Sequence, residues 1–579
     1  MRRTGGLTSA HGNTRWLTLA ALALSLLAGV PGRAQEAPAT NETPNAVTPV
    51  LSEGSAIPID RLRWHMPDPA TDREVSRKLI AELRERGEDS RAKFIERTLE
   101  IAEPIRRENQ LRLTLEEALH RALANNYAIE VQRYNPAIET TRVVEAEAAF
   151  DATFFVNATK NNSDRPTGSA LQANDVDVTN VAAGVRKNLP SGATISSSWE
   201  LRRTKTTLSF QTINPEYTTG LVVDIRQPML RNFGVDVTQS VIRLRQNDRR
   251  VSEYAFQRQV RDTLRQTEEA YWRLVQARSD VVISARLLAQ FEQILVFLKA
   301  RRDFDVNAVQ LSATQANLQQ ERTAFVRRVA NVFDAEDQLI AQMNSDDIDL
   351  ADSIEIIPTD LPNITRLVVD PLAEVQAGLD NRPEIHEQEL RVASARIGVG
   401  QAKSAELPRL DMTFRAESAG LATNSAGSFD QASTYDFITY TVGVEFELPI
   451  GNRSPRAAYR RSQLLHDQQV AALKRTFEEV ILDINLAVRQ VGTTFDQIAP
   501  SFESAEARFR EVDSLVARQE RKDLNTLNSE LAARRALAES RRAMLRAIVD
   551  YNIAVVNLER AKGTLLRYDG VVLPFDDGG

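Results

Sequence analysis

The chain has 579 residues, of which 42% are hydrophobic and 26% charged, and its formal net charge is -7 at neutral pH. It contains no cysteine, which excludes disulfides, thiolate metal ligands, a thiol nucleophile and lipid attachment at a cysteine. The net negative charge argues against nucleic acid as a partner. Only 6% of the residues are aromatic, a balance that suits long helices packed through small side chains.

The N-terminus predicts a cleaved export signal over residues 1–34. Arg2 and Arg3 form a basic start, residues 16–30 are almost wholly apolar, and Ala34 provides a small residue at the cleavage site. The alternative is a membrane anchor, but a spanning helix needs about 20 apolar residues. Cleavage would remove four arginines and no acid, which changes the net charge from -7 to -11. We find no later apolar run of about 20 residues, so the chain could enter a bilayer only with strands.

The rest of the chain predicts one unit that occurs twice. Residues 113–345 form the first repeat and residues 370–567 the second, with an equatorial connector at 346–369. Each repeat is predicted to contain a short helix, strands, a long helix, a turn and a return helix. An N-terminal linker and charged helical extension (35–112) and a C-terminal tail (568–579) flank the repeats.

Matching segments support this duplication. "LEEALHRALANNYAI" resembles "DPLAEVQAGLDNRPEI", and "LVVDIRQPMLRNFG" resembles "VGVEFELPIGNR". In the second pair an alternating pattern ends at Pro228 or Pro449, and a long helix is predicted to follow. The offsets between matches leave about 35 extra residues in the strand region of the first repeat.

The predicted strands alternate between apolar and polar residues with a period of two. In residues 440–448, tyrosine, valine, phenylalanine and leucine occupy one side, while Glu445 and Glu447 occupy the other. The long helices should continue in line with the strands and could not cover the apolar side. A closed barrel, with lipid outside and a wet lumen, satisfies both sides. The residues predicted to face the lumen are Asp224, Arg226, Asp411, Arg415, Glu417, Glu445 and Glu447.

Residues 235–304 contain neither glycine nor proline, and their apolar residues follow the three-and-four spacing of coiled coils. A helix of about 70 residues would be about 105 Å long. The return helix is predicted at 308–343, and the second repeat should contain helices at 457–520 and 527–566, kinked at Pro500. The predicted barrel-to-helix joints are Pro228, Gly234, Pro449 and Gly451.

From residue 113 to residue 566, the chain resembles the TolC family of outer-membrane efflux proteins. The similarity is carried by "LTLEEALHRALANN", "EAYWRLVQAR", "AKSAELPRLDMTF", "VGVEFELPIGNR" and "VVNLERAKGTLL", in this order. The resemblance implies a mixed α and β membrane fold: an outer-membrane β-barrel continued by a long α-helical coiled-coil periplasmic tunnel. It also implies a homotrimer in the outer membrane of a Gram-negative envelope, with a large periplasmic part.

The same resemblance implies a trimeric exit channel of a tripartite efflux or type I secretion system. Such a channel passively conducts substrates that an inner-membrane pump (RND or ABC type) delivers through a periplasmic adaptor (membrane fusion) protein, and it contacts outer-membrane lipid. A non-channel periplasmic coiled-coil scaffold anchored at the outer membrane is the alternative. An exported enzyme is disfavoured, because the five histidines are scattered and no catalytic, cofactor or metal motif is present.

Two regions depart from the pattern of that family. Asn307 stands where the first helix turn usually has a glycine, and Lys522 or Asp523 stands at the second. The segment 178–203, around Pro190, could add two strands to the barrel; because the usual protomer has four, we expect it to project as an extended loop. The periplasmic tip and gate candidates are Asp303, Asp305, Asn307, Lys522, Asp523, Leu524, Asn525, Asn528 and Glu530.

Overall fold

The computed structural model describes residues 63–64, 110–168, 172–208, 210–301, 308–345, 347–348, 354–517 and 524–573. Contacts divide the chain into Met1–Ser52 and Glu53–Gly579, and every described residue belongs to the second unit. The predicted export signal lies outside the described residues, as does almost all of the predicted linker and helical extension.

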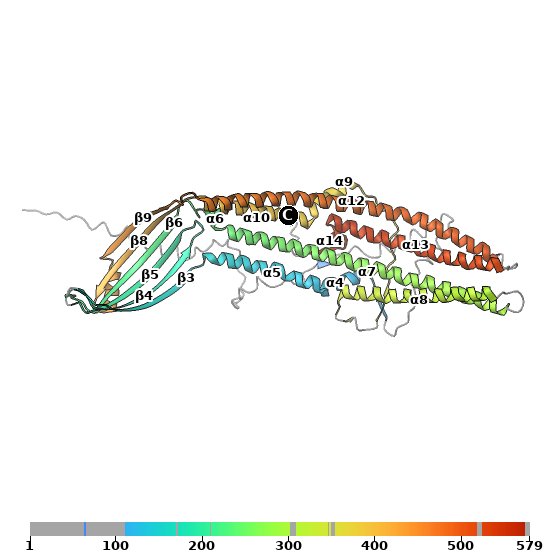
Figure 1. The fold of residues 1–579 in the computed structure, drawn as a ribbon, viewed down its shortest axis with the longest axis horizontal. Coiled ribbons are helices and arrows are strands. Elements are labelled where there is room, and N and C mark those ends of the chain that lie inside the picture. Colours follow the sequence, from blue (N-terminus) through green and yellow to red (C-terminus); the bar gives the residue numbers. More distant parts are fainter. Residues whose placement is uncertain are drawn as a thin grey trace, which may run out of the picture. The chain divides into compact units, whose positions relative to one another are not determined.

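Six strands form one antiparallel sheet, in which they lie side by side (Figure 1). Their spatial order is β3-β4-β5-β6-β8-β9, so the two edge strands, β3 and β9, run in opposite directions. Within the described part of the chain neither edge strand has a second neighbour. The strands are β3 (Thr153–Asp164), β4 (Asp175–Asn188), β5 (Thr194–Thr206), β6 (Glu216–Pro228), β8 (Arg409–Ala422) and β9 (Ile438–Glu447).

The segment around Pro190 belongs to this sheet, so our expectation that it projects as a loop is wrong. It forms the hairpin of β4 and β5, which is closed by a turn between residues 188 and 194. β4 also pairs with β3, and β5 pairs with β6, where Trp199 lies opposite Leu221. Ladder hydrogen bonds on both sides satisfy the backbone groups of this hairpin. The described part of the chain therefore contributes six strands to the sheet, against the four that the family resemblance implies.

Four helices connect directly to these strands and pack side by side in one layer. The order of neighbours in the layer is α5, α7, α10, α12, which is also the order of the strands that they join. The bounds are α5 (Tyr127–Glu147), which leads to β3; α6 (Val235–Thr238) and α7 (Ser240–Ala300), which follow β6; α10 (Pro383–Glu406), which leads to β8; and α12 (Arg453–Ala517), which follows β9.

Two long helical hairpins extend from this layer. α8 (Ala308–Met343) packs on α7, and α13 (Leu524–Lys562) packs on α12 (Figure 1). α7 has 61 residues and α12 has 65, so at 1.5 Å per residue they are about 90 and 100 Å long. The predicted helix from residue 235 is interrupted at Gln239, where α6 ends and α7 begins. α12 continues as a helix through Pro500.

Short elements surround the helices, and the same order of two helices before the strands occurs twice. α4 (Leu115–Asn125) precedes α5, and α9 (Pro371–Asn381) precedes α10. Both begin at a side-chain cap: Thr114 accepts a hydrogen bond from the Glu117 amide, and Asp370 accepts one from the Leu372 amide.

The remaining described elements are short. Two of them are the helices η3 (Ala148–Phe150) and α14 (Leu565–Tyr568), and a third helix, α11 (Ser425–Ser433), packs on β6 and β8. Two small sheets complete the set: the parallel pair β2 (Gln110–Leu113) and β7 (Glu355–Pro358), and the antiparallel pair β1 (Arg63–Trp64) and β10 (Val571–Val572).

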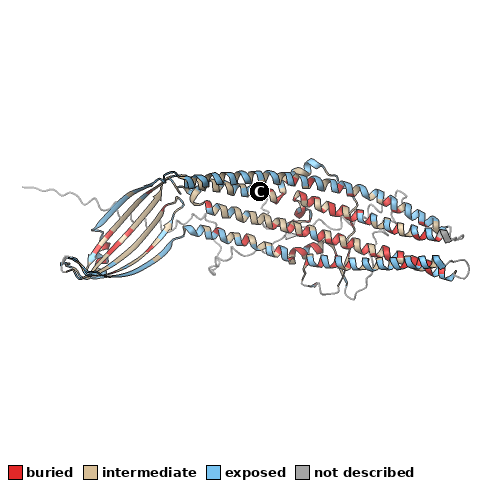
Figure 2. Ribbon diagram, in the orientation of Figure 1, coloured by how far each residue is buried: buried red, intermediate tan, exposed pale blue. Residues whose placement is uncertain are grey.

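The buried core lies among the helices. Figure 2 shows buried residues along the helices, whereas the strands are mostly intermediate or exposed. In the largest cluster, Tyr271 and Leu274 of α7 pack with Leu339 and Met343 of α8 and with Leu113. The sheet, in contrast, keeps large apolar side chains in the open, and their positions define the candidate site.

We expected no apolar run after the export signal that could span a membrane, but one 18-residue window of α7 is apolar enough to do so by length and composition. Of that window, 44% is buried inside the fold. Phe291 and Leu298 of α7 pack with Leu318 of α8 and Leu531 of α13. These contacts identify the apolar stretch as part of the core between the helices.

Candidate functional site

The sheet has one apolar face, because residues opposite each other on neighbouring strands point to the same side. Ile225 lies opposite Phe414, and Phe414 lies opposite Val442. Val442 and Val444 on β9 are 70% and 71% exposed, so this face has no covering layer there. Other members of this apolar face are Phe154, Val156, Val181, Trp199, Leu201, Leu221, Val223, Met412, Tyr440 and Phe446.

The opposite face carries a network of ion pairs at the end of the sheet that adjoins the helices. Arg226 on β6 lies 2.7 Å from the Asp411 carboxylate on β8 and 2.9 Å from that of Glu445 on β9. Arg409 lies 2.8 Å from Asp411, 3.3 Å from Glu445 and 3.4 Å from Glu447. Asp411 is only 4% exposed, because two guanidinium groups cover it. The network connects strands of the first repeat to strands of the second.

The same polar face continues toward the middle of the sheet. Arg415 and Glu417 on β8 form an ion pair of 3.3 Å, and Asp224 on β6 lies opposite Arg415. Gly220 also faces this side, since a Cβ atom there would lie 3.2 Å from the Glu417 carboxylate. All seven residues that the sequence predicted for the lumen therefore share one face, and five of the seven are acids.

The predicted joints occupy the connections between strands and helices. Pro228 is the last residue of β6, and Gly234 precedes α6 with a φ of 98°. Pro449 lies between β9 and α12, and Gly451 has a φ of 89°. Because a proline cannot extend the ladder and positive φ favours glycine, these residue types suit an abrupt change from strand to helix.

The β4–β5 turn contacts the first joint. The Ser191 hydroxyl bonds to the Gln227 side chain at 3.2 Å, and the Gly234 amide donates to the Ser191 carbonyl at 3.2 Å. Gly192 has a φ of 93°, and a Cβ atom there would lie 2.4 Å from the Asn232 carbonyl oxygen. The extra hairpin is thus anchored where β6 turns into helix.

Of the predicted tip residues, those that the structure describes lie in the first two turns of α13. Glu530 is 2% exposed and accepts a hydrogen bond of 2.6 Å from Arg534 on the next helical turn, so its carboxylate is paired. Asn528 is exposed on α13. Leu524 and Asn525 begin α13, but their side chains are outside the description. The candidates outside the described residues are Asp303, Asp305, Asn307, Lys522 and Asp523.

Sequence reasoning missed a buried charged group among the helices. Arg278 of α7 is 1% exposed and contacts Glu336 of α8 at 3.2 Å and Glu355 of β7 at 2.5 Å. Arg278 also donates to the Ile356 carbonyl at 2.9 Å, so it holds β7 against both helices. Its spacing of seven residues from the buried Tyr271 places it on the seam of the coiled coil, where a charge signals an internal partner.

A second missed group is a pair of buried carboxyls. Glu268 of α7 and Asp569, which follows α14, are 2% and 4% exposed. Burial raises the pKa of Glu268 to about 7, while a hydrogen bond with Asp569 acts in the opposite direction. Burial also raises the pKa of Asp569 well above its usual range, and the Glu268 charge adds to this effect. Within the described residues, no group of three or more histidine or acidic side chains could hold a metal ion.

Comparisons with known proteins agree with this architecture. Residues 375–564 match the family model of the outer membrane efflux protein. The solvent efflux pump outer membrane protein SrpC of Pseudomonas putida is 25% identical over 267 residues, which are 45% of this chain and 52% of that protein. The chain thus spans about half the length of the curated relatives that it matches.

Solved structures show the same fold over most of the chain. A membrane protein from Pseudomonas aeruginosa aligns with a TM-score of 0.58 at 19% identity, covering 78% of this chain and 93% of that chain. The CmeC outer membrane channel of Campylobacter jejuni aligns with a TM-score of 0.56 at 15% identity, covering 80% and 91%. The aligned regions cover most of this chain, so they include both its sheet and its long helices. The chain therefore resembles outer membrane efflux proteins, whose family model it matches at residues 375–564, and is a protein of the outer membrane.

Proposed function

We propose that the chain forms a trimeric outer-membrane exit channel of an efflux or type I secretion system. The observation that carries this proposal is an open sheet with one apolar and one charged face, whose strands connect directly to helices of up to 65 residues. An apolar outer face suits lipid, and a charged inner face suits a water-filled lumen.

The open sheet supports assembly from several copies. Six strands are fewer than the eight of the smallest membrane barrels. Because β3 and β9 run in opposite directions, β9 of one copy can pair antiparallel with β3 of the next. Three copies would give a closed barrel of eighteen strands, with no free edge. In this arrangement the helix layers of the copies would close below the barrel into a tunnel.

The remaining parts of the proposal follow from the channel and from the names of the relatives. We infer that the two structurally similar halves arose by duplication. The distal ends of the helical hairpins would meet a periplasmic adaptor, and an inner-membrane pump of the RND or ABC type would supply the energy. The relatives are named for the efflux of solvents, toluene and antibiotics, which supports small organic compounds as cargo.

A periplasmic scaffold without a pore is disfavoured, because it would not need a charged face opposite an apolar one. The two functions differ in a deletion strain that carries the gene on a plasmid. A channel predicts that deletion increases the cellular retention of toluene or of a fluorescent drug, and that the plasmid reverses this effect. It also predicts that detergent extracts the protein from the outer membrane as a trimer. Unchanged retention of every tested compound, together with a monomeric extract, would exclude the channel.

A further inference from the structure

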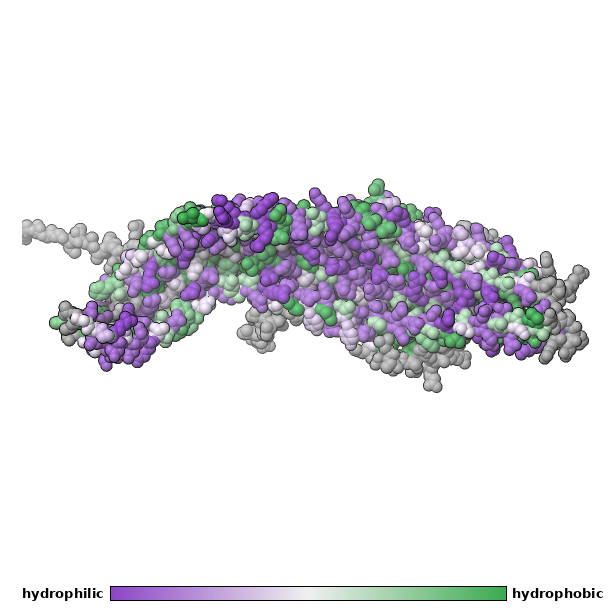
Figure 3. All heavy atoms as spheres, in the orientation of Figure 1, coloured by the Kyte–Doolittle hydropathy of each residue, from purple (hydrophilic) through white to green (hydrophobic). Residues whose placement is uncertain are grey.

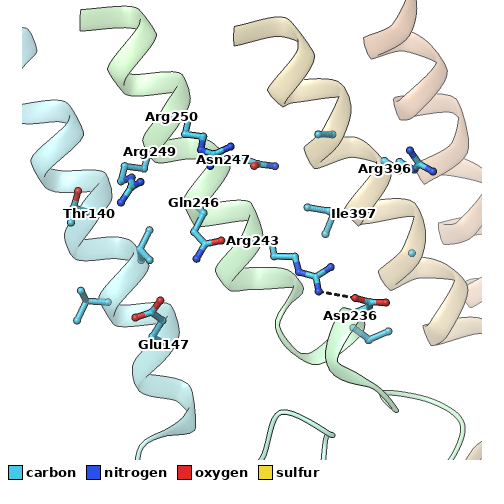
Figure 4. A pocket seen from close by; sticks show the side chains of 15 residues that line it. Thr140, Glu147, Asp236, Arg243, Gln246, Asn247, Arg249, Arg250, Arg396 and Ile397 are labelled. Carbon is cyan, nitrogen blue, oxygen red and sulfur yellow. Dashed lines mark hydrogen bonds and ion pairs between the residues drawn. The ribbon is translucent and has the colours of Figure 1, made fainter. Parts of the chain in front are cut away.

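A pocket of about 920 Å³ between α5, α7 and α10 is unusually rich in arginine (Figure 4). Arg249 lies on the α5 side of α7, while Arg243 and Arg250 lie on its α10 side (Figure 4). Arg396 of α10 also lines the pocket. Against these four arginines the lining offers only two acids, Glu147 and Asp236. The pocket therefore has an excess of positive charge.

Two of these arginines are not neutralised by a direct partner. Arg243 pairs with Asp236 at 2.7 Å, and Arg249 pairs with Glu253 at 3.3 Å. Arg250 and Arg396 are exposed and form no hydrogen bond or ion pair with any residue in the described ranges. Arg250 interacts with Glu253 only by electrostatic attraction at a distance, without a direct contact. An anion with one or two negative charges could neutralise these two arginines.

The repeat of the coiled coil shows on which side of α7 the pocket opens. Arg243 and Arg250 are seven residues apart, and Leu264 lies fourteen residues after Arg250, so all three share one stripe of the helix. Leu264 packs with Leu119 of α4 and Leu565 of α14. The pocket therefore opens on the side that carries α4 and α14. In the proposed channel this side must be the outside, because these elements would obstruct the lumen.

The pocket also lies next to an exposed apolar collar. Between β6 and α7, Met229, Leu230 and Phe233 are 43%, 37% and 49% exposed. On the second connection, hydrophobic side chains gather where β9 meets α12 and adjoin a hydrophilic patch at the start of α12 (Figure 3). Apolar residues followed by exposed cations mark the surface of a bilayer. The cations at the start of α12 are Arg453, Arg456, Arg460 and Arg461.

We propose that the arginine pocket binds the phosphate group of an anionic glycerophospholipid in the periplasmic leaflet of the outer membrane. The guanidinium groups of Arg250 and Arg396 would bind the phosphate oxygens, since arginine matches a phosphate with paired donors. The acyl chains would lie along the apolar collar. The location of the site rests on the proposed channel, whereas binding itself depends on the pocket alone.

The test uses the full-length protein, purified in detergent, and measures binding by titration calorimetry. The probes are dihexanoyl phosphatidylglycerol, dihexanoyl phosphatidylcholine and inorganic phosphate at equal ionic strength. We expect phosphatidylglycerol to bind at least about tenfold more tightly than the other two. The double substitution Arg250→Gln and Arg396→Gln should weaken its binding by about tenfold or more, since two charge-assisted contacts are lost. The variant should fold normally, because both side chains are exposed.

Arg245→Gln is the matched control, because Arg245 is on the same helix, pairs with Asp248 at 3.3 Å and does not line the pocket. Its binding should equal that of the unmodified protein. Equal affinity for both lipids, unchanged binding by the double variant, or phosphate binding as tight as that of phosphatidylglycerol would overturn the proposal. A protein that binds phosphatidylglycerol as predicted but conducts no ions would support this site and contradict the channel, so the two failures are distinguishable.

Discussion

Arg226 on β6 and Asp411 on β8 form an ion pair of 2.7 Å across the boundary between the two groups of strands. Arg409 approaches the same carboxylate at 2.8 Å. β6 is followed by α7 and β8 is preceded by α10, so this pair lies where both helices leave the sheet. It fixes the relative position of the two halves of the chain at the base of the sheet.

Asp411→Asn should reduce the free energy of unfolding by about 1–2 kcal/mol, because a nearly buried carboxylate that binds two arginines is lost. Both arginines are partly exposed, which limits the effect. Glu417→Gln is the control and should cost about 0–1 kcal/mol, since its pair with Arg415 is solvated. Denaturant unfolding in detergent measures both. Equal losses would show that the Asp411 network is no stronger than a surface pair.

Val442→Arg should impair insertion into the outer membrane, because it places a charge on the apolar face. The expected cost is about 2–4 kcal/mol near the midplane of the bilayer. Thr439→Arg is the control on the same strand, since Thr439 lies on the polar face opposite Glu417. The amount of folded, heat-modifiable protein in outer-membrane fractions measures insertion. If both variants insert equally well, the assignment of the two faces is wrong.

Gly192→Val should destabilise the sheet by about 1–3 kcal/mol, because a β-branched residue is strained at positive φ. The new Cβ atom would also collide with the Asn232 carbonyl and disturb the first joint. Gly398→Ala in α10 is the control: it meets open space and should stabilise by about 0.5–1 kcal/mol. Thermal unfolding compares the two. A Gly192→Val protein that melts like the unmodified one would contradict the packing of this turn.

The Glu268–Asp569 pair predicts a dependence of stability on pH. Because burial raises the pKa of Glu268 from about 4.3 to about 7, the folded protein holds a proton that the unfolded chain releases between these values. The free energy of unfolding should therefore fall by up to about 4 kcal/mol as the pH rises through this window. Glu268→Gln should flatten this dependence and raise the melting temperature at pH 8.

Glu269→Gln serves as the control for this prediction, because Glu269 is a partly exposed residue paired with Arg265 at 2.8 Å. Its melting temperature should follow the same course with pH as that of the unmodified protein. If Glu268→Gln also retains that course, the buried pair does not control the stability of the protein.

Local patterns of the sequence were sufficient for much of the fold. Alternation in β9 assigned Val444 and Glu445 to opposite faces, and the run without glycine or proline predicted α7 within a few residues of its ends. The position of the β4–β5 hairpin was not predictable in this way. Its alternation is compatible with a free hairpin or with a sheet, and the pairing of Trp199 with Leu221 depends on residues more than 20 positions away.

The buried partners of Arg278 illustrate the same limit. Glu336 and Glu355 lie 58 and 77 residues further along the chain, so no local spacing connects them. The tip candidates differ, because their position at the predicted helix turns and the family resemblance suggested a gate. Glu530 is paired with Arg534 and buried, and a gate at residues 303–309 and 521–526 stays a prediction.

Ion conduction by the purified protein in a planar bilayer tests the central claim most directly. A channel with the acidic face of the sheet inside predicts stepwise conductance, with a reversal potential in a salt gradient that shifts toward anions in the double variant Glu445→Gln and Glu447→Gln. Removing these carboxylates leaves Arg226 and Arg409 less neutralised in the lumen. Glu478→Gln, on an exposed position of α12, should leave the potential unchanged. Absence of conductance, or the same reversal potential in all three proteins, would contradict a pore lined by this face.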